Sequence, residues 1–281
     1  MSKLLRVAQW HFRQTVTSKQ FLVMALFIPA IFALAALGIA WSRGDAASAA
    51  TSEPLPAFAI AFFLALLLFL GAFLSAIMAL YGVIREKANR VVEIVLSSVS
   101  ATDSLGGIIL GLGLAGLIQV IIWVALAYTA ASRFLPISLS VLSPVQAICY
   151  PVLFVLGYLL IASLYATVGA MMKDIHSGGP AAMVGMIPYA PMLLVAAIIQ
   201  HPEATWVQVA TFFPPFTPAV LMMRLAVSAL PWWEVALAIV TLAASVFLLM
   251  RFSARVFETA ILMYGKNMSF REVWRWGIRR R

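Results

Sequence analysis

The stretch from Ala57 to Ile84 decides the fold of this chain, and it reads AFAIAFFLALLLFLGAFLSAIMALYGVI. It contains no Asp, Glu, Lys or Arg. About 20 apolar residues are enough to cross a bilayer as a helix, so the stretch predicts a transmembrane helix. Its extra length allows the helix to tilt or to extend beyond the lipid.

Five further stretches are also apolar and free of charged side chains, so we expect an all-α, polytopic membrane protein with six transmembrane helices. The stretch nearest the N-terminus, Phe21–Trp41, is longer than the apolar region of about 7–15 residues in a signal peptide, which favours a retained helix over a cleaved leader. The predicted spans are Phe21–Trp41, Ala57–Ile84, Leu105–Ala131, Val145–Met172, Met183–Gln200 and Val235–Met250.

The composition agrees with a membrane protein and excludes several other classes. Of the 281 residues, 64% are hydrophobic and 10% are charged, whereas soluble domains have about 25% charged residues. The net charge of +9 is better explained by membrane orientation and anionic lipid than by nucleic acid. A single cysteine, Cys149, excludes an internal disulfide, and the three histidines are too far apart for a metal motif.

The basic residues predict the orientation of the chain. If the N-terminus is cytoplasmic, 16 of the 19 Lys and Arg residues fall on the cytoplasmic side. Cytoplasmic loops are enriched in Lys and Arg, so both the N-terminus and the basic tail 251–281 are expected in the cytoplasm. Residues 1–20 are expected to form an amphipathic helix in the plane of the interface.

The segment 207–233 is apolar, but a single crossing here would place the basic tail outside. It contains Pro214, Pro215 and Pro218, and a proline inside a helix removes a backbone hydrogen bond. It also contains Arg224. We therefore expect an outer re-entrant pair of short helices rather than a seventh span.

The segment 85–103 separates the second and third predicted spans on the cytoplasmic side. Read as a helix, it places Glu86, Arg90, Glu93 and Ser97 on one polar stripe, opposite an apolar stripe. Such a helix is either a plain interfacial connector or a coupling helix that docks on a cytoplasmic partner.

Two smaller features are candidate contact sites. Lys173 and Asp174 begin a compact, turn-rich cytoplasmic loop, which we expect to be a secondary contact. Gly107 and Gly111 form a GxxxG pair, which either allows close approach of another helix or reflects the general abundance of glycine in membrane helices.

The chain contains no G-x-x-x-x-G-K-[ST] nucleotide motif and no protease or hydrolase motif. The predicted spans also lack the ionisable residues that pumps and ion-coupled carriers keep at membrane depth. We therefore expect no catalytic residue, no metal and no cofactor in this chain, and an energy source on another chain.

The order of several motifs resembles the ABC-2 family of transporter permeases. Residues 85–98 (REKANRVVEIVLSS, ending at Ser98) are similar to the family signature, and 107–111 (GIILG) continue it. Residues 213–218 (FPPFTP) resemble the outer segment of the family, and 261–266 (ILMYGK) resemble the tail of its sodium-efflux, NatB-like branch. The linker 42–56 is short, whereas members of that branch usually carry a large outer domain there.

The resemblance implies the six-span permease fold of the type V exporters, in the plasma (inner) membrane of a prokaryote. It implies two partners, a cytoplasmic ATPase that binds ATP and Mg, and a second permease copy as a homodimer or related heterodimer. It makes 85–103 the coupling helix, with Glu86, Arg90, Glu93, Ser97 and Ser98 at the docking surface. The implied function is efflux of sodium or of a drug-like, amphiphilic compound. The alternatives are a secondary transporter and a scaffold protein that transports nothing.

Overall fold

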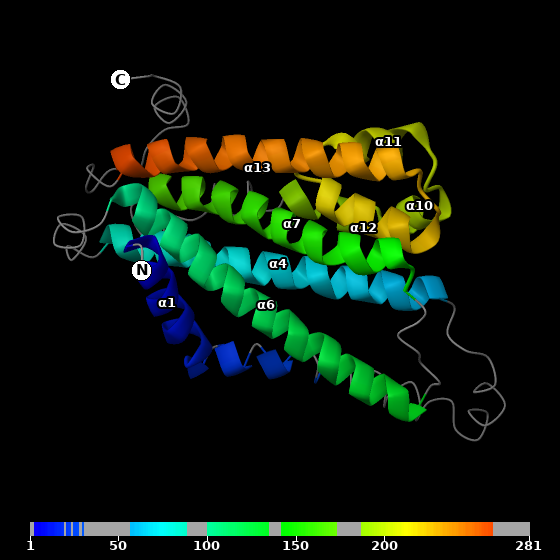
Figure 1. The fold of residues 1–281 in the computed structure, drawn as a ribbon, viewed down its shortest axis with the longest axis horizontal. Coiled ribbons are helices and arrows are strands. Elements are labelled where there is room, and N and C mark those ends of the chain that lie inside the picture. Colours follow the sequence, from blue (N-terminus) through cyan, green and yellow to red (C-terminus); the bar gives the residue numbers. More distant parts are fainter. Residues whose placement is uncertain are drawn as a thin grey trace.

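The computed structural model describes residues 3–19, 21–23, 25–27, 30, 57–88, 100–134, 142–172 and 187–260. All regular structure within these ranges is helical. Figure 1 shows long helices side by side along the long axis of the molecule, and the helix labelled α6 diverging from them toward one end.

The four long helices are α4 (Ala57–Ala88), α6 (Ala101–Phe134), α7 (Pro144–Met171) and α13 (Trp232–Ala260). Within the described ranges, they are the helices long and apolar enough to cross a membrane, and they correspond to four of the six predicted spans. The apolar window of α13 is 22% buried, against 50–56% for the other three. α13 therefore lies at the edge of the bundle, packed on α7 (Figure 1).

Local side-chain bonds fix where these helices begin. The Ser143 hydroxyl accepts a hydrogen bond from the Gln146 N–H, and the Gln146 side chain accepts one from the Ser143 N–H. Together with Pro144 in the first turn, this capping box starts α7. Ser100 plays a similar part for α6, since its hydroxyl accepts from the Asp103 N–H at 3.1 Å.

Small residues let the long helices approach one another closely. A Cβ atom at Gly116 of α6 would clash with the hydroxyl of Ser75 on α4, and one at Gly113 would lie 2.5 Å from the ring of Tyr158 on α7. The Tyr158 hydroxyl donates to the Ile109 carbonyl at 2.6 Å. Close backbone approach and interhelical hydrogen bonds hold membrane helices together, because lipid supplies no hydrophobic driving force between them.

A cluster of buried hydroxyl groups joins α7 to α13. The Ser253 hydroxyl lies 2.7 Å from the Ser163 carbonyl and 2.7 Å from the Thr167 hydroxyl. Such polar contacts fix the register of two apolar helices that could otherwise slide along each other.

Over its described part, the predicted span Met183–Gln200 is not one continuous helix. From Ile187 the chain forms a 3-10 turn, η4 (Ile187–Tyr189), and two short helices, α9 (Ala190–Leu193) and α10 (Val195–Gln200). Pro188 and Pro191 lack the N–H groups that a continuous helix needs. The Leu194 N–H donates to the Pro191 carbonyl at 3.1 Å, which tightens the chain at this break.

Other predicted boundaries also differ from the structure. α4 continues through Ala88 and α6 begins at Ala101, so both ends of the predicted coupling helix 85–103 belong to long helices. Of the predicted tail 251–281, the first ten residues continue α13 to Ala260. Ser253, Val256 and Phe257 are buried there, so the amphipathic period outlasts the purely apolar stretch.

The predicted amphipathic helix 1–20 corresponds to α1 (Lys3–Val16). α1 packs on α6 and buries Ala8 and His11, while Leu5 is exposed. The Trp123 indole N–H of α6 donates to the Ala25 carbonyl at 3.0 Å, which ties the segment after α1 to the same helix. Most of the predicted first span Phe21–Trp41 lies outside the described residues.

Candidate functional site

The predicted docking residues on the cytoplasmic side are mostly not described. Arg90, Glu93, Ser97, Ser98, Lys173 and Asp174 lie outside the described residues, and Glu86 is described only as part of the last turn of α4. The docking surface therefore stays a prediction. The Thr102 hydroxyl donates to the Glu258 carboxylate at 2.7 Å, so the end of this segment is bonded to α13.

The structure brings the other group of predicted residues together in a pair of short helices. α11 (Thr205–Phe212) and α12 (Thr217–Val227) are joined by residues 213–216, and we call 205–227 the hairpin. Pro214 and Pro215 lie in its turn, and Pro218 and Arg224 lie on α12. The hairpin lies at the end of the bundle where α4, α7 and α13 begin, which we call the hairpin end (Figure 1).

Hydrogen bonds within the turn replace those that the prolines cannot make. The Phe213 carbonyl accepts from the N–H groups of Phe216 and Thr217 at 2.8 and 2.9 Å. The buried Thr217 hydroxyl lies 2.7 Å from the Thr211 carbonyl and 3.0 Å from the Phe213 carbonyl. Irregular backbone inside a membrane protein needs such partners, so the turn is suited to lie within the bundle.

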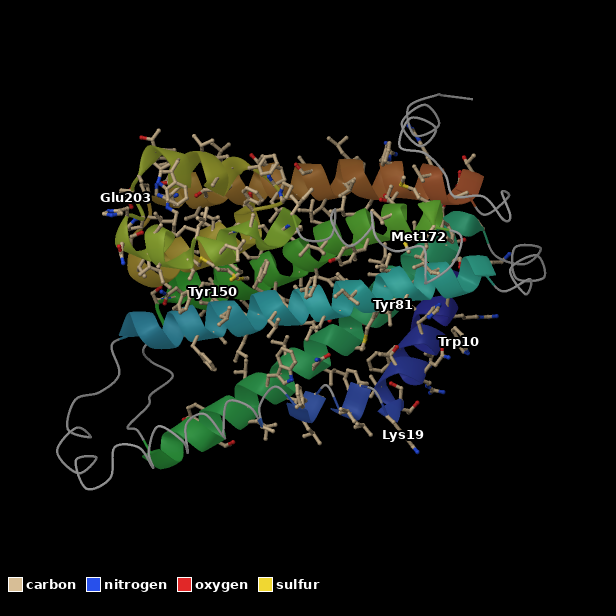
Figure 2. The ribbon with its side chains drawn as sticks, turned by 180° about the vertical axis from the view of Figure 1, so that it is seen from behind. Trp10, Lys19, Tyr81, Tyr150, Met172 and Glu203 are labelled. Carbon is tan, nitrogen blue, oxygen red and sulfur yellow. The ribbon has the colours of Figure 1, made fainter. Side chains whose placement is uncertain are left out.

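The turn reaches beyond the midpoint of α7. The Gln146 side chain donates to the Leu225 carbonyl at 2.6 Å, and the Tyr150 hydroxyl donates to the Met222 carbonyl at 3.3 Å. Further along, a Cβ atom at Gly157 would lie 2.9 Å from the Pro218 Cβ. α12 thus runs antiparallel to the first part of α7. In Figure 2, Tyr150 and Glu203 lie toward the hairpin end, opposite Trp10 and Met172.

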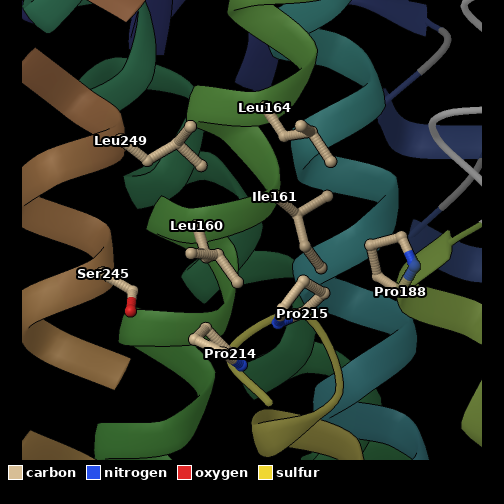
Figure 3. Close-up of a pocket in the computed structure, with 8 residues that line it drawn as sticks. All are labelled: Leu160, Ile161, Leu164, Pro188, Pro214, Pro215, Ser245 and Leu249. Atoms are coloured by element: carbon tan, nitrogen blue, oxygen red, sulfur yellow. The ribbon is translucent and has the colours of Figure 1, made fainter. Parts of the chain in front are cut away.

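A cavity of about 270 Å³ lies at the tip of the hairpin, between α7 and α13 (Figure 3). Among the described lining residues, the one polar side chain is Ser245, whose hydroxyl donates to the Thr241 carbonyl at 2.8 Å. These residues therefore offer apolar contact to an occupant and no charged group. The lining residues are Leu160, Ile161, Leu164, Pro188, Pro214, Pro215, Ser245 and Leu249.

Arg224 is the most constrained side chain of the hairpin, and it is fully buried. Its Nε–H donates to the Pro202 carbonyl at 2.9 Å, and its Nη1–H donates to the Thr211 hydroxyl at 3.0 Å. Nη1 also forms an ion pair with the carboxylate of Glu234. Nη2 lies 3.6 Å from the carboxylate of Glu203, whose side chain is exposed.

The positions of the two buried charges agree with the helix dipoles. Arg224 is in the last turn of α12, near the negative end of its dipole, and Glu234 is in the first turn of α13, near the positive end. A buried charge is strongly destabilising without its partner. This pair therefore connects the end of α12 to the beginning of α13.

Sequence reasoning named Arg224 but missed its partners Glu234, Thr211 and Glu203. The predicted last span begins at Val235, so Glu234 fell just outside it and was given no role. The available signal was a single acid that directly precedes a span, ten residues after a lone arginine in an apolar segment. The predicted spans contain no charged residue, but the structure buries an ion pair just outside the last span, at the hairpin end.

Gly107 and Gly111 lie where α1 crosses α6. A Cβ atom at Gly107 would lie 2.5 Å from the side chain of Val7, and one at Gly111 would clash with the Ala8 carbonyl oxygen. The pair therefore forms a close contact face, and its partner is α1. Within the described ranges, no group of three His, Cys, Asp or Glu residues is placed to hold a metal ion.

Comparison with known proteins agrees with this geometry. The model of the ABC-2 family transporter protein matches residues 44–255. The chain is 25% identical over 217 residues to YhaP of Bacillus subtilis, an uncharacterised protein, covering 73% of this chain and 52% of YhaP. It is 26% identical over 195 residues to MJ1024 of Methanocaldococcus jannaschii, also uncharacterised, covering 68% of this chain and 47% of that protein. The chain therefore spans about half the length of these relatives.

Proposed function

This chain belongs to the ABC-2 family of transporter proteins, and on that basis we propose that it is the permease subunit of an exporter whose ATP is hydrolysed on a separate cytoplasmic subunit. The family match, which covers most of the chain, carries the proposal. The four long apolar helices support it, because they make this an integral membrane protein. Proteins of this family generally work with a cytoplasmic ATPase.

In this proposal the hairpin end faces outward and both termini lie in the cytoplasm of a prokaryotic cell, at its inner membrane. The hairpin is then a re-entrant pair that enters from outside and returns. The segment 85–103 and the loop at Lys173 and Asp174 contact the ATPase, which binds ATP and Mg. A second copy of the chain completes the translocation path as a homodimer.

The cavity at the tip of the hairpin supports an amphiphilic, drug-like substrate over sodium. Its lining is apolar, and the hydroxyl of Ser245 is already bonded within α13. An apolar moiety gains free energy when it leaves water for such a surface. Among the described lining residues, a sodium ion bound there would meet no carboxylate and a single side-chain oxygen, that of Ser245.

The test is reconstitution of the chain in liposomes, alone and with the ABC ATPase that co-purifies with it. The chain alone should hydrolyse no ATP. The complex should show ATP hydrolysis that depends on the permease, and ATP-driven movement of ethidium in preference to radiolabelled sodium. Robust ATP hydrolysis by a contaminant-free preparation of the chain alone would sink the proposal.

One observation favours a second candidate, a secondary transporter. Such transporters bind ions and substrates at broken helices, and residues 187–200 form a broken helix. The same liposomes distinguish the two functions. Transport driven by a proton or sodium gradient without ATP would favour the secondary transporter, and a scaffold protein would show no transport under either condition.

A further inference from the structure

We propose that Arg224 joins the hairpin and the first turn of α13 into one rigid unit, and that this unit moves as a block against α7 during transport. The second half of this statement rests on the proposed permease function. The first half is a property of the folded chain alone.

The contacts of Arg224 define the unit. From its position on α12, the guanidinium group bonds to the loop before α11 through the Pro202 carbonyl and to α11 through the Thr211 hydroxyl. It reaches α13 through Glu234. One buried side chain thus connects four consecutive segments, which span residues 202–234.

These bonds are coupled through shared atoms. Nη1 serves both Thr211 and Glu234, and the Thr211 hydroxyl donates in turn to the Val207 carbonyl at 2.9 Å. Loss of one partner leaves a buried charge uncompensated, which is strongly destabilising. The segments are therefore expected to keep their relative positions when the rest of the molecule changes shape.

The contact between the hairpin and α7 is of a different kind. The bonds from Gln146 and Tyr150 go to backbone carbonyls near the hairpin end. Deeper in the bundle, Gly157 faces Pro218, and the cavity separates the turn from α7 and α13. Among the described residues, no ion pair joins the hairpin to α7. This interface can slide at lower cost than the bonds of Arg224 can break.

The rigid unit is tested by thiol labelling, without any need for transport. The variant Val207→Cys introduces a thiol on the fully buried face of α11, and the native Cys149 on α7 is the control in the same chain. In the parent both thiols should react slowly with a small maleimide. Adding Arg224→Met should speed labelling at position 207 at least tenfold and leave Cys149 protected. If Arg224→Met sped the labelling of both thiols equally, or of neither, the proposed rigid unit would be wrong.

A double-mutant cycle provides a second measure of the same coupling. Arg224→Met and Glu234→Leu should each lower the midpoint of thermal unfolding in detergent, because each leaves one buried charge without its partner. The double variant should recover most of the loss, since no unpaired charge remains. Additive losses would show that the two residues act independently, and the proposed unit would be wrong.

The movement against α7 is tested by a reversible cross-link. The variant Gly157→Cys/Pro218→Cys, in a Cys149→Ala background, places two thiols at positions whose Cβ atoms would lie 2.9 Å apart. Disulfides hold their Cβ atoms about 3.5–4.5 Å apart, so a small separation of α7 and α12 is enough to accommodate the bond. Oxidation should abolish the permease-dependent ATP hydrolysis of the reconstituted complex, and reduction should restore it. Full activity after complete oxidation would overturn the movement. Inactivity of the unmodified complex would instead count against the permease function and leave the labelling result standing.

Discussion

Gly111 shows how one residue can determine the position of an entire helix. The backbone of α1 lies directly over it, so the absence of a side chain is what allows α1 to pack. Gly106, five residues earlier on α6, faces a different kind of neighbour. A Cβ atom there would lie 3.0 Å from the end of the Leu4 side chain, which can rotate away.

We expect Gly111→Ala to displace α1, whereas Gly106→Ala should be tolerated. Overpacking against rigid backbone costs about 1–3 kcal/mol, and a flexible side chain relieves most of that cost. The displacement can be measured by trypsin cleavage at Arg6 and Arg13, which are exposed on α1. Cleavage should be faster in the Gly111 variant than in the Gly106 variant. Equal cleavage of the two would show that the close contact does not hold α1.

At the scale of elements, apolar length predicted the long helices well. The predicted span Val145–Met172 differs from α7 by one residue at each end, because a backbone in lipid must satisfy its own hydrogen bonds and a helix does so locally. Hydropathy did not predict the break within the segment 187–200, because this segment is as apolar as one that forms a continuous membrane-spanning helix. The prolines there were visible, but their effect depends on which neighbours satisfy the freed carbonyls.

We expect the hairpin to enter and leave from the outer side. In a Cys149→Ala background, Thr205→Cys and Ala229→Cys introduce thiols at exposed positions, at the first residue of the hairpin and just after its last. Both should react with a membrane-impermeant maleimide added to intact cells. If position 205 reacts from outside and position 229 only after the membrane is opened, the segment crosses the membrane and the topology must be redrawn.

The next prediction concerns the predicted coupling helix 85–103, of which residues 89–99 lie outside the described ranges. The double variant Glu86→Lys/Glu93→Lys reverses two charges of the polar stripe. An exposed ion pair contributes only about 0.2–1 kcal/mol, so the membrane domain should still fold. We expect loss of co-purification with the ATPase, or of coupled ATP hydrolysis, while thermal unfolding of the isolated chain is unchanged. Normal assembly and normal coupling would remove these residues from the docking surface.

At the scale of the whole molecule, the bundle has two unlike ends. At the hairpin end, Arg224 bonds across several segments within a short stretch of sequence. At the opposite end, the hydrogen bond from Thr102 to Glu258 joins α6 to α13, which lie far apart in the sequence. The order of motifs in the sequence predicted the family, but not these pairings. They depend on which helix faces which, and hydropathy carries no information on that.

We expect both termini on the cytoplasmic side. Epitope tags fused before Lys3 and after the last residue should both be inaccessible to antibody in intact cells, and both should bind it after permeabilisation. The physical reason is the excess of basic residues at both ends, which resist translocation. A tag accessible on one end only would require an odd number of crossings.

The buried ion pair also has a consequence for the order in which the protein is synthesised. Ribosomes deliver Arg224 before Glu234, so there is an interval in which the arginine has been made and its acid has not. If the hairpin closed in that interval, it would bury Arg224 with only the exposed carboxylate of Glu203, 3.6 Å away, to offset its charge. Closure is therefore expected to become favourable only once α13 supplies Glu234, although α4 and α7, against which α12 packs, are already present. The last helix thus completes the bundle and also stabilises the preceding segment.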